Sequence, residues 1–330
     1  MFSPGSVSDV NRHDGVVMRL FMTSRKGENE ADCVVIGGGP AGLTAALYLA
    51  RFHISVTVLH DGSSRAHSIP LSHNQSLFPG GISGADLLRR MQEQALAYGA
   101  DLRLGSILDL TQADGGFTVH AAHGSVRAKT VLLATGVINH RPKMDEQEHD
   151  DAIKRGLLRY CPICDAFEVT DKAVAVLGSG QKGHAEAVFL RSYSRDITLI
   201  TPEAEHGLTS EQVARLQALG IRIEAGPLDA IELDGNRIGL KTRKGLHWFD
   251  TLYPALGSNI RSGLAGALGA RLSEEGCVIV DRHQRTSVAG LYAAGDVVAG
   301  LDQISNAMGQ ATLAATAIRN DLSERATLRR

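Results

Sequence analysis

The chain has 330 residues, and 34 lysine and arginine residues against 36 aspartate and glutamate residues give a formal net charge of −2. A nearly neutral chain lacks the positive field that nucleic acid or an anionic membrane would require, so neither is expected as a partner. Hydrophobic residues make up 43% of the chain and no apolar run reaches the roughly 18 residues of a membrane span, which favours a soluble globular protein of about two domains.

The first residues are rich in serine, glycine, asparagine and charge, and they show no hydrophobic period. They predict a flexible tail over residues 1–30, without a secretory signal or transit peptide, and Met22 is a second candidate start. Charged residues 323–330 predict a frayed C-terminus. The four cysteines are too few for a disulfide framework and are typical of a reducing cytoplasm.

After the tail, the sequence predicts a strand, a glycine turn, a helix and a second strand. These elements cover residues 33–36, 37–42 (GGGPAG), 43–52 and 55–59. This order is the βαβ unit of a dinucleotide-binding fold, in which the glycines allow the tight turn, the approach of a pyrophosphate and close helix packing. The turn residues predicted to hold a dinucleotide are Gly37, Gly39, Pro40, Ala41 and Gly42.

The second strand of such a unit usually ends in an acid that binds the ribose hydroxyls. His60 stands at this position, and Asp61 follows it. Two interpretations stay open. Either Asp61 reaches the ribose, or both residues are solvated and the ribose is held less tightly.

The middle of the first unit is predicted to contain an amphipathic helix over residues 86–98 and an antiparallel ribbon. The ribbon strands cover residues 104–110, 116–121 and 125–128. A further strand over residues 131–133 ends at the sequence Ala-Thr-Gly, which contains Thr135 and Gly136.

Cys161 and Cys164 form the motif C-P-I-C. Zinc would need a second cysteine pair or suitably spaced histidines, whereas Cys33 and Cys277 stand alone, so no metal site is expected. The pair is therefore interpreted as redox-active.

Pro162 is expected to begin a helix, which would place Cys161 at the helix N-terminus. The helix dipole would there stabilise a thiolate and make it a better nucleophile. Asp165 is the candidate general acid that protonates a leaving thiolate, and the alternative is a plain helix-start charge.

A second strand, glycine turn, helix and strand follow over residues 173–177, 178–183 (GSGQKG), 184–192 and 197–200. Their order repeats the first unit, so the chain is predicted to hold two nucleotide-binding modules of related design. The candidate contacts of this second turn are Gly178, Gly180, Lys182 and Gly183. Further elements are predicted over residues 209–219 (helix), 221–224, 230–233, 237–241 and 291–294 (strands), and 306–322 (helix).

Two dinucleotide modules, with C-x-x-C-D opening the second, resemble the low-molecular-weight thioredoxin reductase family of flavoproteins over residues 31–322. The resemblance implies FAD on the first glycine turn. It also places further residues beside the cofactor: Asn74 and the loop 78–84 next to the flavin, Thr135 and Gly136 at the crossover, Gly295 with Asp296 on the ribityl chain, and Gln303 with Ile304 at the pyrimidine end. Cys164 would lie nearest the flavin, and Cys161 would attack the substrate disulfide.

The resemblance further implies an α/β fold of two Rossmann-like, three-layer ββα domains, the second inserted into the first. The FAD domain is placed at residues 31–142 and 258–322, and the NAD(P)-binding-like domain with the cysteine pair at residues 143–257. Family members are homodimers whose domains rotate to carry the cysteine pair between the flavin and a partner protein.

The sequence departs from the family where NADPH would bind. Family members carry clustered basic residues after the second strand of this module, but no Lys or Arg occurs between Arg195 and Arg215. Glu203 and Glu205 would oppose a 2′-phosphate, and Thr201 stands where NADH would want an acid. NADPH is therefore a doubtful cofactor.

The expected function is that of an FAD-dependent disulfide oxidoreductase, cytoplasmic and homodimeric. It would act on a thioredoxin-like protein and receive electrons from a ferredoxin-type donor or another flavin. Three alternatives stay open: an NADPH-dependent thioredoxin reductase, a small-molecule dithiol oxidase that uses oxygen, and a flavin-bearing redox sensor without turnover.

Overall fold

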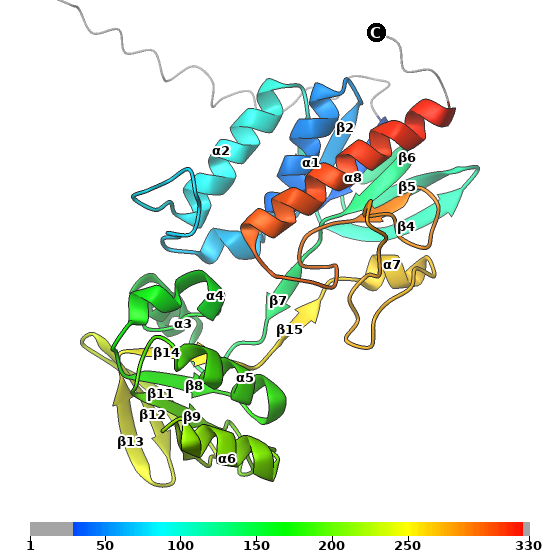
Figure 1. Cartoon of the computed structure of the whole chain (residues 1–330). Coiled ribbons are helices and arrows are strands. Elements are labelled where there is room, and N and C mark those ends of the chain that lie inside the picture. Colours follow the sequence, from blue (N-terminus) through cyan, green and yellow to red (C-terminus); the bar gives the residue numbers. More distant parts are fainter. Residues whose placement is uncertain (1–28, 326–330) are drawn as a thin grey trace, which may run out of the picture.

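The structure is a computed structural model that describes residues 29–325. It contains two α/β units joined by a pair of short strands (Figure 1). Residues 1–28 of the predicted tail lie outside the described part, while Glu30 already belongs to the first strand. The tail prediction was thus wrong at its end, because Glu30 pairs with Arg127 in the sheet.

The first unit is built on a seven-stranded sheet with the order β3-β2-β1-β6-β5-β4, and β16 pairs with the second half of β6. Pairing is parallel between β1, β2, β3, β6 and β16, and antiparallel in the ribbon of β4, β5 and β6. The strands are β1 (Glu30–Ile36), β2 (Val56–His60), β3 (Asp101–Leu104), β4 (Ile107–Ala113), β5 (Gly116–Ala121), β6 (Gly124–Leu133) and β16 (Leu291–Ala293).

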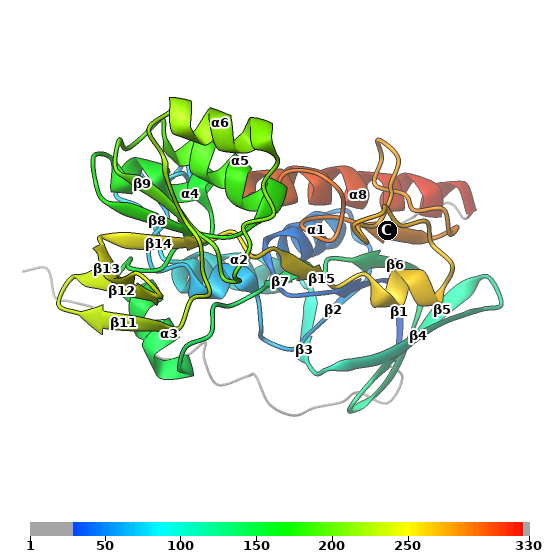
Figure 2. The same cartoon turned by 90° about the horizontal axis from the view of Figure 1, so that it is seen from below.

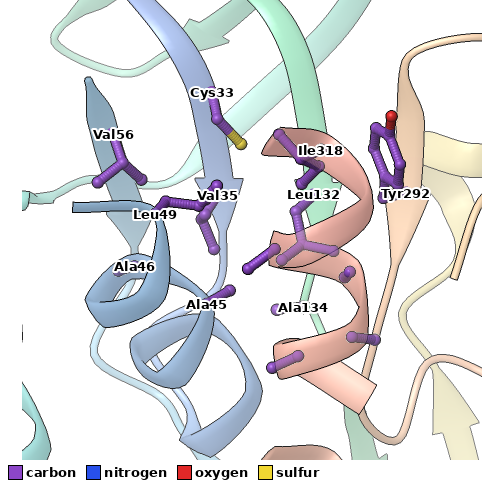
Figure 3. Close-up of a cluster of buried hydrophobic side chains, with 14 of the residues drawn as sticks. Cys33, Val35, Ala45, Ala46, Leu49, Val56, Leu132, Ala134, Tyr292 and Ile318 are labelled. Carbon is purple, nitrogen blue, oxygen red and sulfur yellow. The ribbon is translucent and has the colours of Figure 1, made fainter. Parts of the chain in front are cut away.

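Helices α1 (Pro40–Arg51), α2 (Gly84–Ala97) and α8 (Ile304–Arg325) cover one face of this sheet, together with the short η2 (Arg65–Ser68). The short helix α7 (Gly263–Ala267) packs on the opposite face, where Ala265 belongs to the core. Cys33 and Val35 of β1 point toward α1 and α8, where small residues such as Ala45 let the helices approach closely (Figure 3). Val34 and Ile36 belong to the core on the opposite face, which explains why β1 reads as a continuous apolar run.

The second unit has three layers (Figure 2). A parallel sheet of order β10-β9-β8-β14 lies between helices and an antiparallel sheet of β11, β12 and β13. Its strands are β8 (Val174–Leu177), β9 (Ile197–Ile200), β10 (Arg222–Glu224), β11 (Ala230–Asp234), β12 (Arg237–Thr242), β13 (Gly245–Phe249) and β14 (Thr251–Pro254). Its helices are α3 (Glu146–Lys154), α4 (Pro162–Asp165), η3 (Ala166–Val169), α5 (Gly180–Leu190) and α6 (Ser210–Ala218). The predicted α/β fold of two Rossmann-like units is confirmed.

The connection between the units consists of β7 (Val137–Asn139) and β15 (Ser258–Ile260), which pair antiparallel. Every strand of the second unit lies between them in sequence, and β16 of the first sheet follows them, so the second unit is inserted into the first. The domain boundaries at residues 142/143 and 257/258 stay predictions.

Four predicted segments were wrong in detail. The expected strand 104–110 is divided, because Leu104 ends β3 and pairs with β2, whereas Ile107 begins β4 and pairs with β5. The strands expected at 125–128 and 131–133 form the single strand β6. Residues 323–325 are helical rather than frayed, since Ser323 Oγ bonds the Asn320 carbonyl in the last turn of α8. No helix within residues 29–325 is long and apolar enough to cross a membrane.

Candidate functional site

A cavity of about 650 Å³ is shared by the two units and lies where the predicted cofactor and cysteine residues meet. From the first unit it is lined by Gly37, Gly39, Pro40, Ala41, Asp61, Asn74, Thr135, Gly136, Gly295, Asp296, Gln303 and Ile304, and from the second by Cys161, Cys164 and Asp165. Its volume lies within the range of about 300–1,000 Å³ that is common for ligand and cofactor sites. The structure therefore brings together two sets of residues that are far apart in sequence.

The first glycine turn is shaped by backbone contacts that exclude side chains. Gly37 has φ +121°, and a Cβ there would lie 2.1 Å from the carbonyl oxygen of Ala134. A Cβ at Gly42 would lie 1.9 Å from the Gly37 oxygen, so Gly42 lies behind the turn and allows α1 to pack. Gly39 caps α1 without a side-chain hydrogen bond, and Pro40 occupies the first helical position.

This turn fits the FAD that the resemblance implies. The first turn of α1 carries N–H groups that no capping side chain satisfies, and they face a cavity long enough to reach Gln303 and Ile304 at the start of α8. Gly37, Gly39, Pro40 and Ala41 would hold the pyrophosphate. The cofactor roles of these residues stay predictions.

Asp61 lines the cavity, but its carboxylate already has protein partners. Oδ2 accepts from Arg261 Nη2 at 2.8 Å, and Oδ1 accepts from Ser63 N and Oγ at 2.9 and 2.6 Å. Partial burial alone would raise the pKa of Asp61, yet these hydrogen bonds hold it well below its ordinary value. His60 packs against the turn instead, since a Cβ at Gly38 would lie 2.8 Å from the His60 ring. Arg261, which the sequence analysis missed, thus belongs to this end of the cavity.

Asp296 is paired with Arg65, a second residue that the sequence analysis missed. Arg65 Nη2 lies 2.8 Å from Asp296 Oδ2, and Arg65 Nη1 lies 3.3 Å from Asp302 Oδ2. The same Nη1 donates to Asn139 Oδ1 of β7 at 3.2 Å. Arg65 therefore links the predicted ribityl-binding carboxylate to the connection between the units. It is the first residue of η2, a segment that carries no motif.

Asn74 and Gln303 form a hydrogen-bonded chain that reaches the sulfur atoms. Asn74 Nδ2 donates to Gln303 Oε1 at 3.1 Å. Gln303 Nε2 lies 3.2 Å from Cys161 Sγ and 3.2 Å from Cys164 Sγ. The sequence analysis placed Gln303 at the pyrimidine end of the flavin but did not foresee its contact with the sulfurs, because nothing local indicates where its side chain points.

Cys161 and Cys164 are joined in a disulfide. Pro162 opens α4 as predicted, with Cys161 as its N-cap, and Cys164 N donates to Cys161 O at 2.9 Å. However, α4 spans only one turn, and so short a helix adds little dipole stabilisation of a thiolate. Hydrogen bonds to sulfur carry more weight here than the dipole.

Asp165 lies directly after the cysteine pair, and its side chain binds two residues of its own unit, Arg159 and Tyr253. Oδ2 accepts from Arg159 Nη1 at 2.9 Å, and Oδ1 accepts from Tyr253 OH at 2.8 Å. Burial raises the pKa of Asp165, while the Arg159 cation and the Tyr253 hydroxyl oppose that rise. The proposed acid is thus held in a fixed position by two residues that the sequence analysis missed.

Glu186 of α5 adds a second buried acid near Asp165. Its Oε1 is buried and finds no hydrogen-bond partner among the described residues. Burial, reinforced by the negative charge of Asp165, raises the pKa of Glu186 to about 7. Glu186 is therefore a buried acid that changes its protonation near neutral pH, within electrostatic reach of Asp165.

The second glycine turn is covered by the chain that follows β9. Gly180 N, at the start of α5, donates to the carbonyl oxygen of His206 at 2.8 Å. Gly178 and Gly183 serve packing, because a Cβ at Gly178 would lie 2.8 Å from the Ala255 Cβ and one at Gly183 would lie 2.8 Å from the backbone of Gly178. The glycine pattern here has a structural explanation that needs no nucleotide.

Lys182, the candidate cation of this turn, extends toward the connection between the units. A Cβ at Gly257 would lie 2.7 Å from Lys182 Nζ. Thr201, at the position expected to hold a ribose acid, is fully buried, and its hydroxyl donates to Glu203 O at 2.8 Å. Within the described chain, no group of three His, Cys, Asp or Glu side chains could hold a metal ion.

The sequence profile described as "Pyridine nucleotide-disulphide oxidoreductase" matches residues 31–311. A thioredoxin reductase of Peptoclostridium litorale is 29% identical over 90% of this chain and 98% of its own. A thioredoxin reductase of Mycolicibacterium smegmatis is 30% identical over 81% of this chain and 88% of its own. Among solved structures, the thioredoxin reductase of Streptococcus pyogenes MGAS5005 superposes with a TM-score of 0.81 at 27% identity, covering 90% of this chain and 99% of its own.

Proposed function

Because the chain belongs to the pyridine nucleotide-disulphide oxidoreductase family, we propose that it passes two electrons between bound FAD and the Cys161–Cys164 pair, and on to a protein disulfide, without using NADPH. Its family and its relatives identify the chain as a thioredoxin reductase-like flavin disulfide oxidoreductase. The electron donor and the substrate are the proposed part.

The observation that carries the proposal is the shared cavity. The disulfide and the first glycine turn line the same cavity of about 650 Å³, although they belong to different units. FAD bound there would supply a two-electron carrier. The first turn of α1 would hold the cofactor, while the disulfide lies at the cavity wall and Arg159 fixes Asp165 beside it.

The thiol chemistry follows from the pair itself. Two electrons and one proton convert the disulfide into one thiol and one thiolate. The Cys161 thiolate would attack the partner disulfide, form a mixed disulfide and release one partner thiolate, which takes a proton. The Cys164 thiol would then attack Cys161 and lose its proton, which restores the internal disulfide, while the second partner sulfur leaves as a thiolate and takes up that proton. We assign the transfer of that proton to Asp165.

The covered second glycine turn supports an electron source other than NADPH. Gly180 N donates to the His206 carbonyl rather than facing an open phosphate site. No Lys or Arg occurs between residues 195 and 215 to neutralise a 2′-phosphate. A ferredoxin-type protein or another flavin would supply electrons without this site.

Exposed apolar side chains beside the disulfide support a protein as the substrate. Ile163 in α4 and Phe167 in η3 are 53% and 80% exposed. Exposed apolar side chains next to a reactive pair are typical of a surface that binds another protein, here a thioredoxin-like one.

We also propose that the chain acts as a homodimer. Sedimentation of the purified protein will test its oligomeric state.

An anaerobic titration of the bound flavin tests the donor. NADPH, NADH and reduced ferredoxin are added in turn while the flavin absorbance is followed. We expect ferredoxin to bleach the flavin and both nicotinamides to leave it oxidised. Rapid bleaching by NADPH would overturn the donor assignment and indicate an NADPH-dependent thioredoxin reductase. Oxygen uptake with small dithiols, but no reaction with thioredoxin, would indicate a dithiol oxidase.

A further inference from the structure

Gln303 is the residue through which the first unit contacts the disulfide of the second. Its Nε2 lies 3.2 Å from both Sγ atoms, so one amide nitrogen faces both members of the pair. The side chain is 9% exposed, which keeps water from competing for the same contacts. The position of Gln303 is fixed because its backbone joins α8: Ala307 N donates to Gln303 O at 2.9 Å.

The orientation of the Gln303 amide follows from the hydrogen-bonded chain behind it. Asn74 Nδ2 donates to Gln303 Oε1 at 3.1 Å, and Asn74 Oδ1 accepts from Ser72 Oγ at 2.8 Å. Ser72 is itself anchored, since its backbone pairs with Ile82. Reversing the Gln303 amide would point a carbonyl oxygen at two disulfide sulfurs, which carry no hydrogen to donate.

This arrangement matters most after reduction. A neutral disulfide is a weak acceptor, whereas a thiolate is charged, and hydrogen bonds to ionised groups are about twice as strong as neutral ones. An N–H group held against both sulfurs therefore favours the reduced, thiolate-bearing state over the disulfide. The one-turn helix α4 contributes little to this preference.

We propose that Gln303 is a catalytic residue whose side-chain amide, held by Asn74, stabilises the thiolate formed when the Cys161–Cys164 disulfide takes up two electrons and one proton. The proposal rests on the function proposed above. The electrons come from reduced FAD, the S–S bond breaks, one sulfur keeps the charge and the other takes the proton. Asn74 acts through Gln303 and is a positioning residue.

The test uses the full-length flavoprotein reduced with dithiothreitol and freed of reductant. The rate of alkylation by iodoacetamide is measured from pH 5 to pH 10 for wild type, Gln303→Leu, Gln303→Glu and Asn74→Ala. We expect Gln303→Leu to move the midpoint of the thiol titration upward by about one pH unit, because one unit corresponds to about a tenfold change in the ionisation equilibrium. Gln303→Glu should move it further, since it places a like charge beside the thiolate, and Asn74→Ala should move it less.

A second readout is the equilibrium of the pair with a dithiothreitol redox buffer. Loss of thiolate stabilisation should favour the disulfide by about tenfold in Gln303→Leu, which corresponds to about 30 mV for a two-electron couple. Gln217→Leu, in an exposed part of α6, is the matched control and should leave both readouts unchanged.

The outcomes separate the two proposals. If the wild-type pair neither opens nor closes in the redox buffer, the proposed function fails. If the pair cycles normally but every Gln303 and Asn74 variant keeps the wild-type titration midpoint and redox equilibrium, the role of Gln303 is refuted while the proposed function stands. Should Gln303→Leu fail to fold, Gln303→Glu and Asn74→Ala still decide the matter.

Discussion

Arg159 and Asp165 form an ion pair next to the disulfide, with 2.9 Å between Arg159 Nη1 and Asp165 Oδ2. Both side chains are mostly buried, and the second carboxylate oxygen accepts from Tyr253 OH. Burial raises the pKa of Asp165, and the guanidinium is the main influence that opposes the rise. The protonation of the proposed acid therefore depends on Arg159.

Arg159→Gln should shift the pH profile of disulfide exchange to higher pH. Without the cation, Asp165 keeps its proton to a higher pH, because burial then acts on its pKa with less opposition. The profile is measured in a single turnover: the pair is first reduced with dithiothreitol, freed of reductant and then mixed with a small disulfide, so that no further electron donor is needed. Stability should fall by roughly 1–3 kcal/mol, since Asp165 loses a charged partner. Tyr253→Phe keeps the cation and should give a smaller shift. An unchanged profile in Arg159→Gln would show that Asp165 does not act through its protonation.

Replacing each cysteine in turn should separate the roles of the two sulfurs. Cys161→Ser should abolish turnover and leave Cys164 as a thiolate beside the flavin, which is expected to produce long-wavelength charge-transfer absorption. Cys164→Ser should abolish turnover without that band. Absorption spectra between pH 6 and pH 9, together with disulfide reduction assays, check both statements. Full activity in both variants would make the pair structural.

The sequence was sufficient for features that depend on local chemistry. The glycine turn before α1, Pro162 at the start of α4 and the order β8, α5, β9 all follow from turn residues and hydrophobic patterns within a few positions. Strand β1 was recognisable because both of its faces are buried. Helix α3 was missed although Asp145 caps it, because it is short and only Ala152 and Ile153 among its nine residues are apolar.

The partners of the site residues were not predictable in the same way. Tyr253 is 88 positions from Asp165, and Asn74 is 229 positions from Gln303, so only the folded chain brings them together. The contact that covers the second glycine turn is made by the backbone carbonyl of His206, for which no side-chain pattern exists. The hydrogen-bond partners of the site residues and the cover of the second glycine turn could therefore be identified only in the folded chain.

Glu186→Gln should remove a pH dependence of stability. The pKa of Glu186 is raised from 4.5 to about 7 in the folded protein, chiefly by burial, so the folded state binds this proton more tightly than the unfolded state. The stabilisation is complete below about pH 4.5 and is lost as the pH rises through about 7, by up to about 3 kcal/mol. Urea denaturation at pH 5 and pH 8 should show a smaller difference for Glu186→Gln than for wild type.

A matched control for this prediction is Glu211→Gln, which changes an exposed glutamate in the first turn of α6. It should leave the difference between pH 5 and pH 8 as in wild type. If Glu186→Gln retains the full wild-type difference as well, the pH dependence comes from other groups and the raised pKa of Glu186 is contradicted.

Gly42→Ala should weaken both the fold and cofactor binding, because the new Cβ would lie 1.9 Å from the backbone oxygen of Gly37. The backbone cannot give way cheaply, since Gly37 is itself held against Ala134. We expect a loss of about 1–3 kcal/mol in unfolding free energy and a lower ratio of FAD to protein after purification.

Gly309→Ala in α8 is the control, because its Cβ would meet nothing within 4 Å. It should keep the FAD content and raise the unfolding free energy by about 0.5–1 kcal/mol. Equal FAD content in both variants would show that close packing behind the first glycine turn is not required for binding the cofactor.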